Sequence, residues 1–337
     1  MKKLSMVSLL ILSLSLVATS LFAAQINLKF ASTNAAGEPS YEVQKKWTDA
    51  VEKASNGRIH IDLLPLDAVV KSTDLLTGVR NKILDGAIST SAWYSGDDPG
   101  FGLIGDTISA WNTDEDMFKF YYFGGGMQVV DKIFNAYGAK LIGVAMTGAE
   151  SLPSKIPLKG VADFKGVKMR APSGPIQKLF AMMGAAPVGL PSSEVYTALE
   201  KGVIDAADYT TFSGNYKTGV LDIAKYPIYP GIHSSPTVHI IMNLDEWKAL
   251  PENDQIFMQM FFKGMALDSM LRPHYEDRIA FGEAVKKGIT PVAWSDTEKA
   301  KVRSYAREIW EETAKKSEIG KMYYDALQKY LASQGMN

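Results

Sequence analysis

Hydrophobic and polar residues alternate over residues 26–31, INLKFA, a pattern typical of a half-buried β-strand. Two further apolar stretches, 59–64 and 86–90, are also predicted to be strands, with a second helix near 72–81 between them. The helix after the first strand is expected to bury Val43, Trp47, Ala50 and Val51. The order strand, helix, strand, helix, strand favours a parallel α/β sheet.

A second unit of strands and helices is predicted in the middle of the chain. Residues 167–170 read as a short strand, and residues 176–183 carry apolar side chains at helical spacing. Another helix is expected to begin at an N-cap, Ser192 or Ser193, and the stretch 203–209 reads as the next strand. This arrangement brings two strand ends together.

Arg170 stands at one of these strand ends. A guanidinium group suits a planar partner that accepts two hydrogen bonds, such as a carboxylate. The alternative is an arginine on the surface without a binding role. The residue type and its position leave both interpretations open.

The remaining elements are predicted to connect the two units. The strand at 238–243 returns to the first unit, and a long helical region follows it, opening at Asp245 or Pro251 and containing Pro273, which could kink it. A final amphipathic helical region is expected at 297–334. Neither repeats nor low-complexity linkers occur, so crossovers must join the two units. A helix and a strand are also predicted at 127–137 and 141–145.

The central segment resembles the signature of DctP-type substrate-binding proteins of TRAP (tripartite ATP-independent periplasmic) transporters. The resemblance rests on DFKGVKMR at 163–170, MGAAPV at 183–188 and EVYTALEKGVIDA at 194–206. Two other segments, YYFGGGMQVVDKIF and AKYPIYPGIH, are similar to the branch of that family that binds 2-oxoacids and lactate. In the family, the arginine at the position of Arg170 binds the carboxylate of the ligand.

The resemblance implies an α/β, two-lobed periplasmic binding protein fold of type II-like topology, with a hinged cleft and a long helix that spans both lobes. Residues 25–148 and 235–275 are expected to form the first lobe. Residues 149–234 and 276–337 are expected to form the second lobe with the C-terminal helices.

The start of the chain and its composition indicate a secreted protein. Residues 1–24 combine Lys2 and Lys3 with an apolar stretch and small residues at the end, as in a cleaved signal peptide, with a retained anchor as the alternative. This predicts a periplasmic location. Without Lys2 and Lys3, 34 basic residues face 37 acidic ones, and no basic patch suggests nucleic acid. The chain has no cysteine, which excludes thiol catalysis and thiolate metal sites.

Several residues are predicted to line a ligand cleft, because they lie in loops past strand ends or follow from the resemblance. Trp93 and Tyr94 come directly after the strand at 86–90, although both could instead belong to the core. Residues 210–219 are polar and glycine-rich and predict a loop at the cleft. The other candidates around the ligand are Arg170, Asp208, Tyr209, Asn34, Thr147, Asn215 and His233.

Asp208 and Tyr209 are also candidate metal ligands. In the resembling branch, the acidic residue at this position and its neighbour help to hold a cation that bridges the carboxylate and the 2-oxygen of the ligand. Carboxylate and carbonyl oxygens suit Na⁺ or Ca²⁺. However, Ala145 stands where that branch usually has a glutamine ligand, and a structural ion pair of Asp208 is the alternative. We expect no obligatory cofactor.

These features favour a solute-binding protein over an enzyme. The four histidines are scattered, and neither an HExxH nor a GxSxG motif is present. We expect capture of a small organic acid, a 2-oxo or 2-hydroxy monocarboxylate, and its delivery to TRAP permease subunits. The alternatives are a C4-dicarboxylate, sulfonate or aromatic-acid binding protein of the same system, and a periplasmic ligand-sensing protein. The resemblance is compatible with a monomer or with a homodimer that exchanges a terminal helix.

Overall fold

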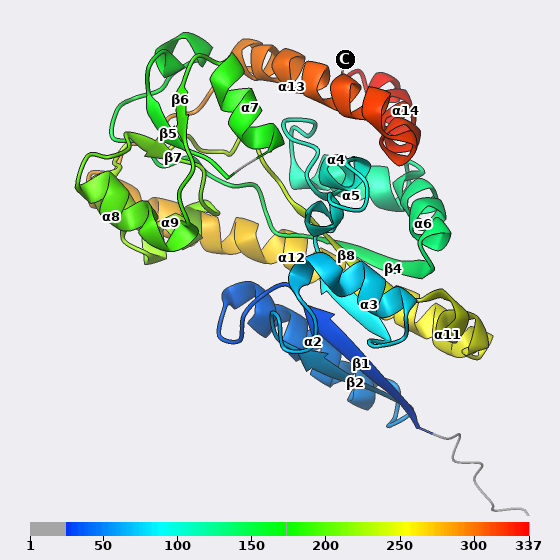
Figure 1. Ribbon diagram of the computed structural model, residues 1–337. Coiled ribbons are helices and arrows are strands. Elements are labelled where there is room, and N and C mark those ends of the chain that lie inside the picture. Colours follow the sequence, from blue (N-terminus) through cyan, green and yellow to red (C-terminus); the bar gives the residue numbers. More distant parts are fainter. Residues whose placement is uncertain (1–24, 173, 337) are drawn as a thin grey trace, which may run out of the picture.

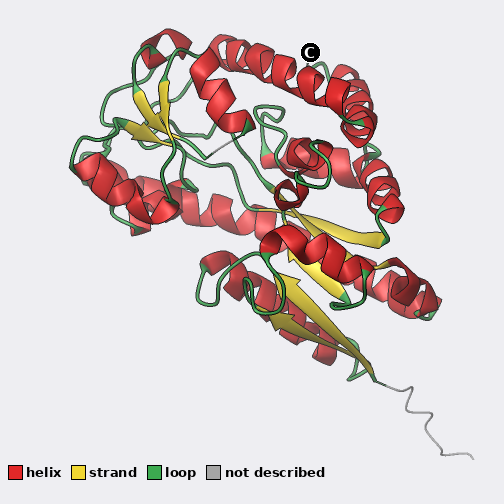
Figure 2. Ribbon diagram, in the orientation of Figure 1, coloured by secondary structure: helices red, strands yellow, loops and turns green. Residues whose placement is uncertain are grey.

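The computed structural model describes residues 25–172 and 174–336. The predicted signal peptide, residues 1–24, lies outside these residues. Figures 1 and 2 show two sheets, one larger and one smaller, with helices packed around them. A two-lobed α/β fold was predicted, and the architecture agrees with it. Among the described residues, no helix is both long and apolar enough to cross a membrane.

The larger sheet has the strand order β2-β1-β3-β8-β4. Strand β1 pairs in parallel with β2 and β3, as predicted. Strand β8 pairs antiparallel with both β3 and β4, so the chain returns to this sheet after building the second one. The strands are β1 (Ile26–Ser32), β2 (Ile59–Leu64), β3 (Gly86–Ser89), β4 (Ala139–Met146) and β8 (Thr237–Asn243).

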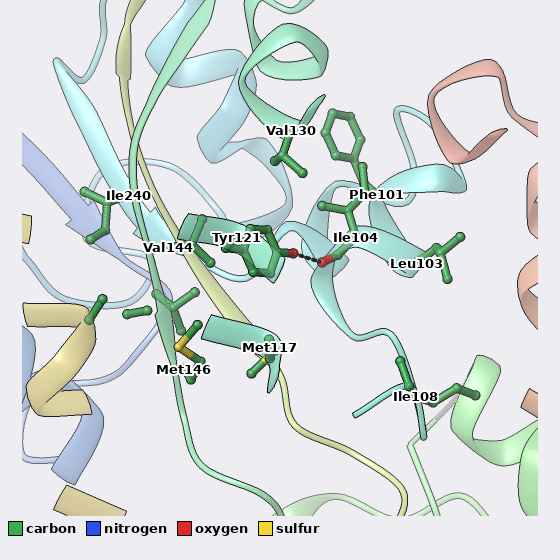
Figure 3. Close-up of a cluster of buried hydrophobic side chains, with 14 of the residues drawn as sticks. Phe101, Leu103, Ile104, Ile108, Met117, Tyr121, Val130, Val144, Met146 and Ile240 are labelled. Atoms are coloured by element: carbon green, nitrogen blue, oxygen red, sulfur yellow. Dashed lines mark hydrogen bonds between the residues drawn. The ribbon is translucent and has the colours of Figure 1, made fainter. Parts of the chain in front are cut away.

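Helices pack on this sheet and complete the core of the first lobe. Tyr121 lies at the centre of the cluster in Figure 3, where its hydroxyl donates to the carbonyl oxygen of Ile104 at 3.4 Å. The helices are α2 (Pro39–Ala54), α3 (Leu75–Arg80), α4 (Gly100–Gly105), α5 (Asp114–Tyr122), α6 (Gly126–Ala136) and α11 (Leu244–Ala249). Short 3₁₀ helices occur at η1 (Ser72–Asp74) and η2 (Ser91–Tyr94).

Helix α2 presents a somewhat different face to the sheet than predicted. Val51 is buried as expected, but Ala50 is exposed. Tyr41, Gln44 and Thr48 occupy the buried side instead. The polar side chains can be buried because they find partners: the Gln44 side chain accepts a hydrogen bond from the Ser32 hydroxyl at 2.6 Å, for example.

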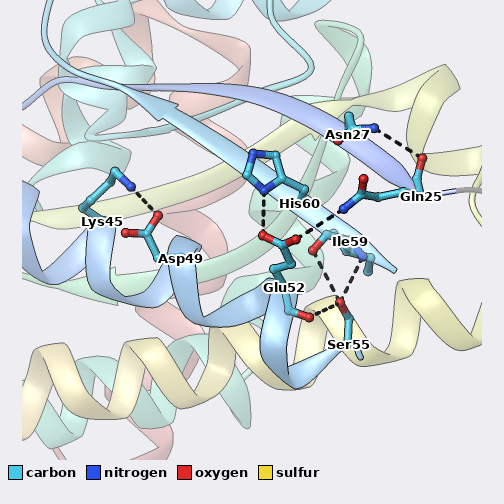
Figure 4. A network of polar contacts seen from close by, with 8 residues as sticks. All are labelled: Gln25, Asn27, Lys45, Asp49, Glu52, Ser55, Ile59 and His60. Carbon is cyan, nitrogen blue, oxygen red and sulfur yellow. Dashed lines mark hydrogen bonds and ion pairs between the residues drawn. The ribbon is translucent and has the colours of Figure 1, made fainter. Parts of the chain in front are cut away.

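The end of α2 is tied to β2 by the polar network in Figure 4. Glu52 contacts Nδ1 of His60 at 3.0 Å. The hydroxyl of Ser55 accepts from the backbone N–H of Ile59 at 2.9 Å. Asn56 and Gly57, both with positive φ angles, make the turn between the helix and the strand. These contacts fix the first helix on its strand but lie far along the chain from Arg170.

The smaller sheet has the order β6-β5-β7, and β5 pairs in parallel with both neighbours. The prediction missed β6 and made the last strand too long. It was also wrong for residues 210–219, because a helix occupies most of this stretch. The elements are β5 (Lys168–Arg170), β6 (Ala186–Val188), β7 (Ala206–Ala207), η3 (Val161–Phe164), η4 (Ser192–Glu194), α7 (Pro175–Met182), α8 (Val195–Glu200), α9 (Phe212–Lys217) and α10 (Val220–Ile223).

Helix α12 (Glu252–Lys286) connects the two sheets. It packs against β4 of the larger sheet and against α9 beside the smaller one, and Pro273 lies inside it. Helices α13 (Asp296–Lys316) and α14 (Glu318–Ser333) follow, and both lie along the upper side of Figure 1. Helix α13 packs on α7 and α4, and α14 packs on α4 and α6. The exact residue boundaries of the two lobes stay a prediction.

Candidate functional site

Arg170 lies at the end of β5, the central strand of the smaller sheet. Its side chain is only 6% exposed. The Nε hydrogen is donated to the carbonyl oxygen of Leu190 at 3.1 Å, and Nη2 donates to the hydroxyl of Ser192 at 3.1 Å. Nη1 donates to the carbonyl oxygen of Asp208. Ser192 therefore positions the arginine, and it makes no N-cap hydrogen bond to its own helix, contrary to the prediction.

The guanidinium keeps hydrogen-bonding capacity for a further partner. It has five N–H groups, and the three contacts use one each on Nε, Nη1 and Nη2. One hydrogen thus remains on each terminal nitrogen. No carboxylate of the described residues lies within ion-pairing distance of Arg170. A buried cation without a contacting anion is costly, so this arrangement favours an anionic ligand.

Asp208 follows β7 and lies next to the arginine. Its backbone N–H donates to the carbonyl oxygen of Arg170 at 2.9 Å, as the parallel pairing of β5 and β7 requires. Its Oδ1 lies 2.9 Å from Nε2 of His233, which is 1% exposed. Burial alone would raise the pKa of Asp208. Hydrogen bonds from His233 and Glu150, together with the charge of Arg170, lower it overall, so this carboxylate is held ionised.

Glu150 completes a cluster with Asp208 and His233. Its Oε2 lies 3.9 Å from Nε2 of His233, and one ligand atom from each of the three residues lies within 4.8 Å of the others. Burial and the neighbouring Asp208 raise the pKa of Glu150 well above its usual value. Because the two acids are neighbours, the site avoids ionising both at once in the absence of a cation.

A further carboxylate, Asp106, reaches the same region from the first lobe. It accepts a hydrogen bond from the hydroxyl of Ser234 at 2.7 Å, directly after His233 in the chain. Its Oδ1 is buried without a hydrogen-bond partner among the described residues. Burial raises the pKa of Asp106 to about 6, against the lowering effect of the Ser234 hydroxyl.

Two crossover segments bring these residues together. The first crossover segment follows β4 and contains Glu150. The second precedes β8 and contains His233. They touch at Gly231, where an added Cβ would lie 2.1 Å from the carbonyl oxygen of Glu150. The two segments contribute to a small pocket beside His233, lined by Thr107, Ser109, Trp111, Asn112, Thr113, Asp114, Ala149, Gly231, Ile232, His233, Ser234 and Ser235.

Two of the other predicted residues are fully buried and hydrogen-bonded to neighbouring residues. Tyr94 is fully buried, bonds to the hydroxyl of Ser89 and packs edge-on against Phe101, with 5.8 Å between ring centroids. Asn215 is also fully buried, and its amide donates to Ser151 and to the carbonyl oxygen of Thr210. Both side chains have the surroundings of core residues.

Four predicted side chains lie at other positions. Trp93 is 47% exposed at the surface of η2. The Asn34 amide group pairs with Glu38 and Gln44 within the first lobe. Thr147 lies on the first crossover segment, and its hydroxyl donates to the carbonyl oxygen of Pro236 at 3.3 Å. Tyr209 packs at the edge of a small apolar cluster, beside the buried Val195, Ala198, Leu199, Ile204, Ala207, Val220 and Ala224.

Sequence reasoning missed Glu150 and Asp106. Neither belongs to a motif, and each is far from Arg170 along the chain. Glu150 does lie five residues after the predicted strand at 141–145, where the chain leaves the first sheet. An acidic residue at such a strand end was the one available signal, by the same rule that singled out Trp93.

The model of a protein family described as bacterial extracellular solute-binding protein, family 7 (DctP), matches residues 30–317. A monocarboxylate 2-oxoacid-binding periplasmic protein of Nostoc sp. is 27% identical over 82% of this chain and 76% of its own length. A TRAP periplasmic solute-binding protein from Rhodobacter sphaeroides, solved in an open form without ligand, is 40% identical. The match covers 92% of this chain and 99% of that one, with a TM-score of 0.86.

A second solved structure shares the fold at lower identity. It is a TRAP solute-binding protein from Colwellia psychrerythraea with bound calcium and pyruvate, which is 23% identical. It covers 91% of this chain and 94% of its own, with a TM-score of 0.75. These relatives are transport proteins that bind a solute.

Proposed function

Because this chain belongs to the DctP family of bacterial extracellular solute-binding proteins, family 7, we propose that it captures a small organic acid through Arg170 and delivers it to a TRAP permease. The observation that carries this proposal is the guanidinium itself. It is buried, it has no contacting carboxylate among the described residues, and one hydrogen remains on each terminal nitrogen. A ligand carboxylate that accepts both hydrogens would satisfy the two unused donors.

The ligand class that we propose is a 2-oxo or 2-hydroxy monocarboxylate. The names of two relatives support it, since one binds monocarboxylate 2-oxoacids and another was solved with pyruvate. A single arginine with a nearby acidic cluster also fits one carboxylate better than two. Among the described residues, the ionised Asp208 would repel the second carboxylate of a C4-dicarboxylate.

A cation beside the ligand is part of this proposal. Calcium accompanies pyruvate in one relative, and sodium would fill the same role at lower charge. Asp208 and Glu150 are carboxylates of the kind that hard cations prefer, and the ligand's own oxygens would complete the shell. Of the two ligands predicted from the sequence, we therefore keep Asp208, add Glu150, and assign no metal contact to the Tyr209 side chain.

Binding would be coupled to closure of the two lobes. Glu150 and His233 lie on the crossover segments, so a ligand that contacts the cluster interacts with the hinge. Closure excludes water, which strengthens the attraction between Arg170 and the carboxylate. A ligand that makes contacts only in the closed form shifts the population towards it, and the permease would recognise that form. We propose a periplasmic location.

The proposal is tested by calorimetry with a panel of 2-oxo and 2-hydroxy acids, with and without Na⁺, Ca²⁺ and a chelator. In Arg170→Gln, we expect affinity to fall at least 30-fold, since removing one partner of a buried charge pair costs about 2–5 kcal/mol. Arg80→Gln, which alters an exposed arginine of the first lobe, is the matched control. Binding that is unchanged in Arg170→Gln would refute the assigned anchor. Binding that is lost on chelation would support the cation.

A further inference from the structure

The site contains more acidic groups than one arginine can balance. Glu150 and Asp208 lie together, Asp106 is tied to the residue after His233, and Arg170 is the cation beside them. With His233 counted as a neutral imidazole, a proton shared between Glu150 and Asp208 would still leave at least as many negative as positive charges. A bound monocarboxylate adds another negative charge. Since a buried charge without a partner is strongly unfavourable, the ligand complex needs a further positive charge.

The geometry places that positive charge next to the ligand's carboxylate. Nη1 of Arg170 contacts the main chain of Asp208, so the anchor and the Asp208 side chain belong to adjacent parts of one site. An ammonium group has three hydrogens to donate and accepts none, which complements a pair of carboxylates. In a 2-amino acid, the ammonium stands one carbon away from the carboxylate. The same two contacts would therefore be made by one small zwitterion.

His233 disfavours a metal ion that is held by all three residues. Its Nε2 faces the ionised Asp208, which only accepts hydrogen bonds, so Nε2 carries the hydrogen and cannot also bind a metal. Moving the hydrogen to Nδ1 would leave it unsatisfied, because Nδ1 is buried without a partner among the described residues. The ring of Phe180 lies on His233, with 5.5 Å between the centroids. Only the carboxylates of Glu150 and Asp208 then remain to bind a cation, and two carboxylates are enough to bind an ammonium group.

We propose that Asp208 and Glu150 bind an ammonium group next to the ligand's carboxylate, so that this protein binds 2-amino acids. Where the ligand lacks an ammonium, the same two residues favour a 2-hydroxy acid, which can donate a hydrogen bond, over a 2-oxo acid, which cannot. The inference rests on the proposed function, because it uses the same Arg170 anchor. It extends the ligand class from acids that need a separate cation to 2-amino acids, whose ammonium group supplies the positive charge.

The test compares 2-amino, 2-hydroxy and 2-oxo acids of the same carbon skeleton, in sodium-free buffer with a chelator. Alanine, lactate and pyruvate form one set, and leucine with its 2-hydroxy and 2-oxo counterparts forms a larger one. In at least one set, we expect the amino acid to bind at least tenfold more tightly than the oxo acid. Binding of oxo or hydroxy acids without any binding of amino acids overturns this inference and leaves the proposed function standing. If no acid of any class binds with or without cations, both fail.

Variants separate recognition of the ammonium from a structural effect. In Glu150→Gln and Asp208→Asn, the preference for the amino acid over the hydroxy acid should fall at least tenfold, because only the amino acid needs the negative charge. Asp163→Asn is the control, since that carboxylate lies elsewhere in the second lobe and accepts the N–H of Lys159 at 2.7 Å. An equal loss for all ligands in both variants, or an unchanged preference, would contradict the assignment.

Discussion

Asp114 is predicted to stabilise the junction of the two lobes by contacting both crossover segments and helix α12. It is the first residue of α5 and is 2% exposed. Its carboxylate accepts the N–H of Ala149 at 3.2 Å and the hydroxyl of Ser235, one from each crossover segment. Nε2 of His274, on α12, lies 3.0 Å from it. Replacement by alanine removes all three contacts at once and leaves the partners unpaired.

The size of the effect follows from these contacts. A hydrogen bond to a charged group contributes about 1.5–3 kcal/mol, but the His274 partner is half exposed and counts for less, so we expect Asp114→Ala to cost about 4 kcal/mol in all. For the roughly 310 residues that follow the predicted signal peptide, this corresponds to a melting temperature lowered by about 6 °C. Urea unfolding monitored by circular dichroism measures the free energy, and a thermal scan measures the shift.

Asp116→Ala is the matched control, because Asp116 lies on the same turn of α5 but is more exposed. It caps the helix by accepting the N–H of Thr113 at 3.2 Å, and its loss should cost only about 1 kcal/mol. Equal destabilisation in the two variants would show that Asp114 does no more than cap α5. The proposal that Asp114 stabilises the contact between the crossover segments would then be wrong.

Two further predictions concern the same junction. The hydrogen bond to Asp114 raises the pKa of His274, so this residue stabilises the fold below the unfolded pKa and loses that effect as pH rises through its folded value. The melting temperature of His274→Gln should therefore lie further below that of the unmodified protein at pH 6 than at pH 8.5, and a gap independent of pH would argue against the pair. Gly231→Ala should weaken acid binding and lower the melting temperature, because its Cβ would meet the Glu150 carbonyl oxygen at 2.1 Å. Unchanged calorimetric affinity in a folded variant would show that the crossover contact does not position the site.

Regular elements were predictable where hydrophobic periodicity is strong. Strand β1 alternates from Ile26 to Phe30 and was predicted with nearly its observed bounds. The short strand β6 was missed, because three residues with Pro187 in the middle show no clear hydrophobic period. Residues 210–219 were wrongly predicted as a loop, since their glycines and polar side chains outweighed the apolar face of α9, where Phe212 is buried.

The site was only partly predictable for a different reason. Arg170 and Asp208 were singled out from their places near strand ends and from the family resemblance. The structure brings them into contact through the main chain, and their roles in ligand binding stay predictions. Glu150 depends on how the crossover segments meet in space, which no local pattern encodes. Tyr94 shows the opposite error, because a loop of small polar residues around an aromatic side chain looks the same whether the ring faces a cleft or the core.

The most direct test of the central claim is a crystal structure of the protein with its bound acid. We predict that the ligand's carboxylate oxygens lie about 2.8 Å from Nη1 and Nη2 of Arg170, with the group on the second carbon facing Asp208 and Glu150. A ligand bound elsewhere, or a carboxylate directed away from a guanidinium that keeps only its present contacts with Leu190, Ser192 and Asp208, would contradict it.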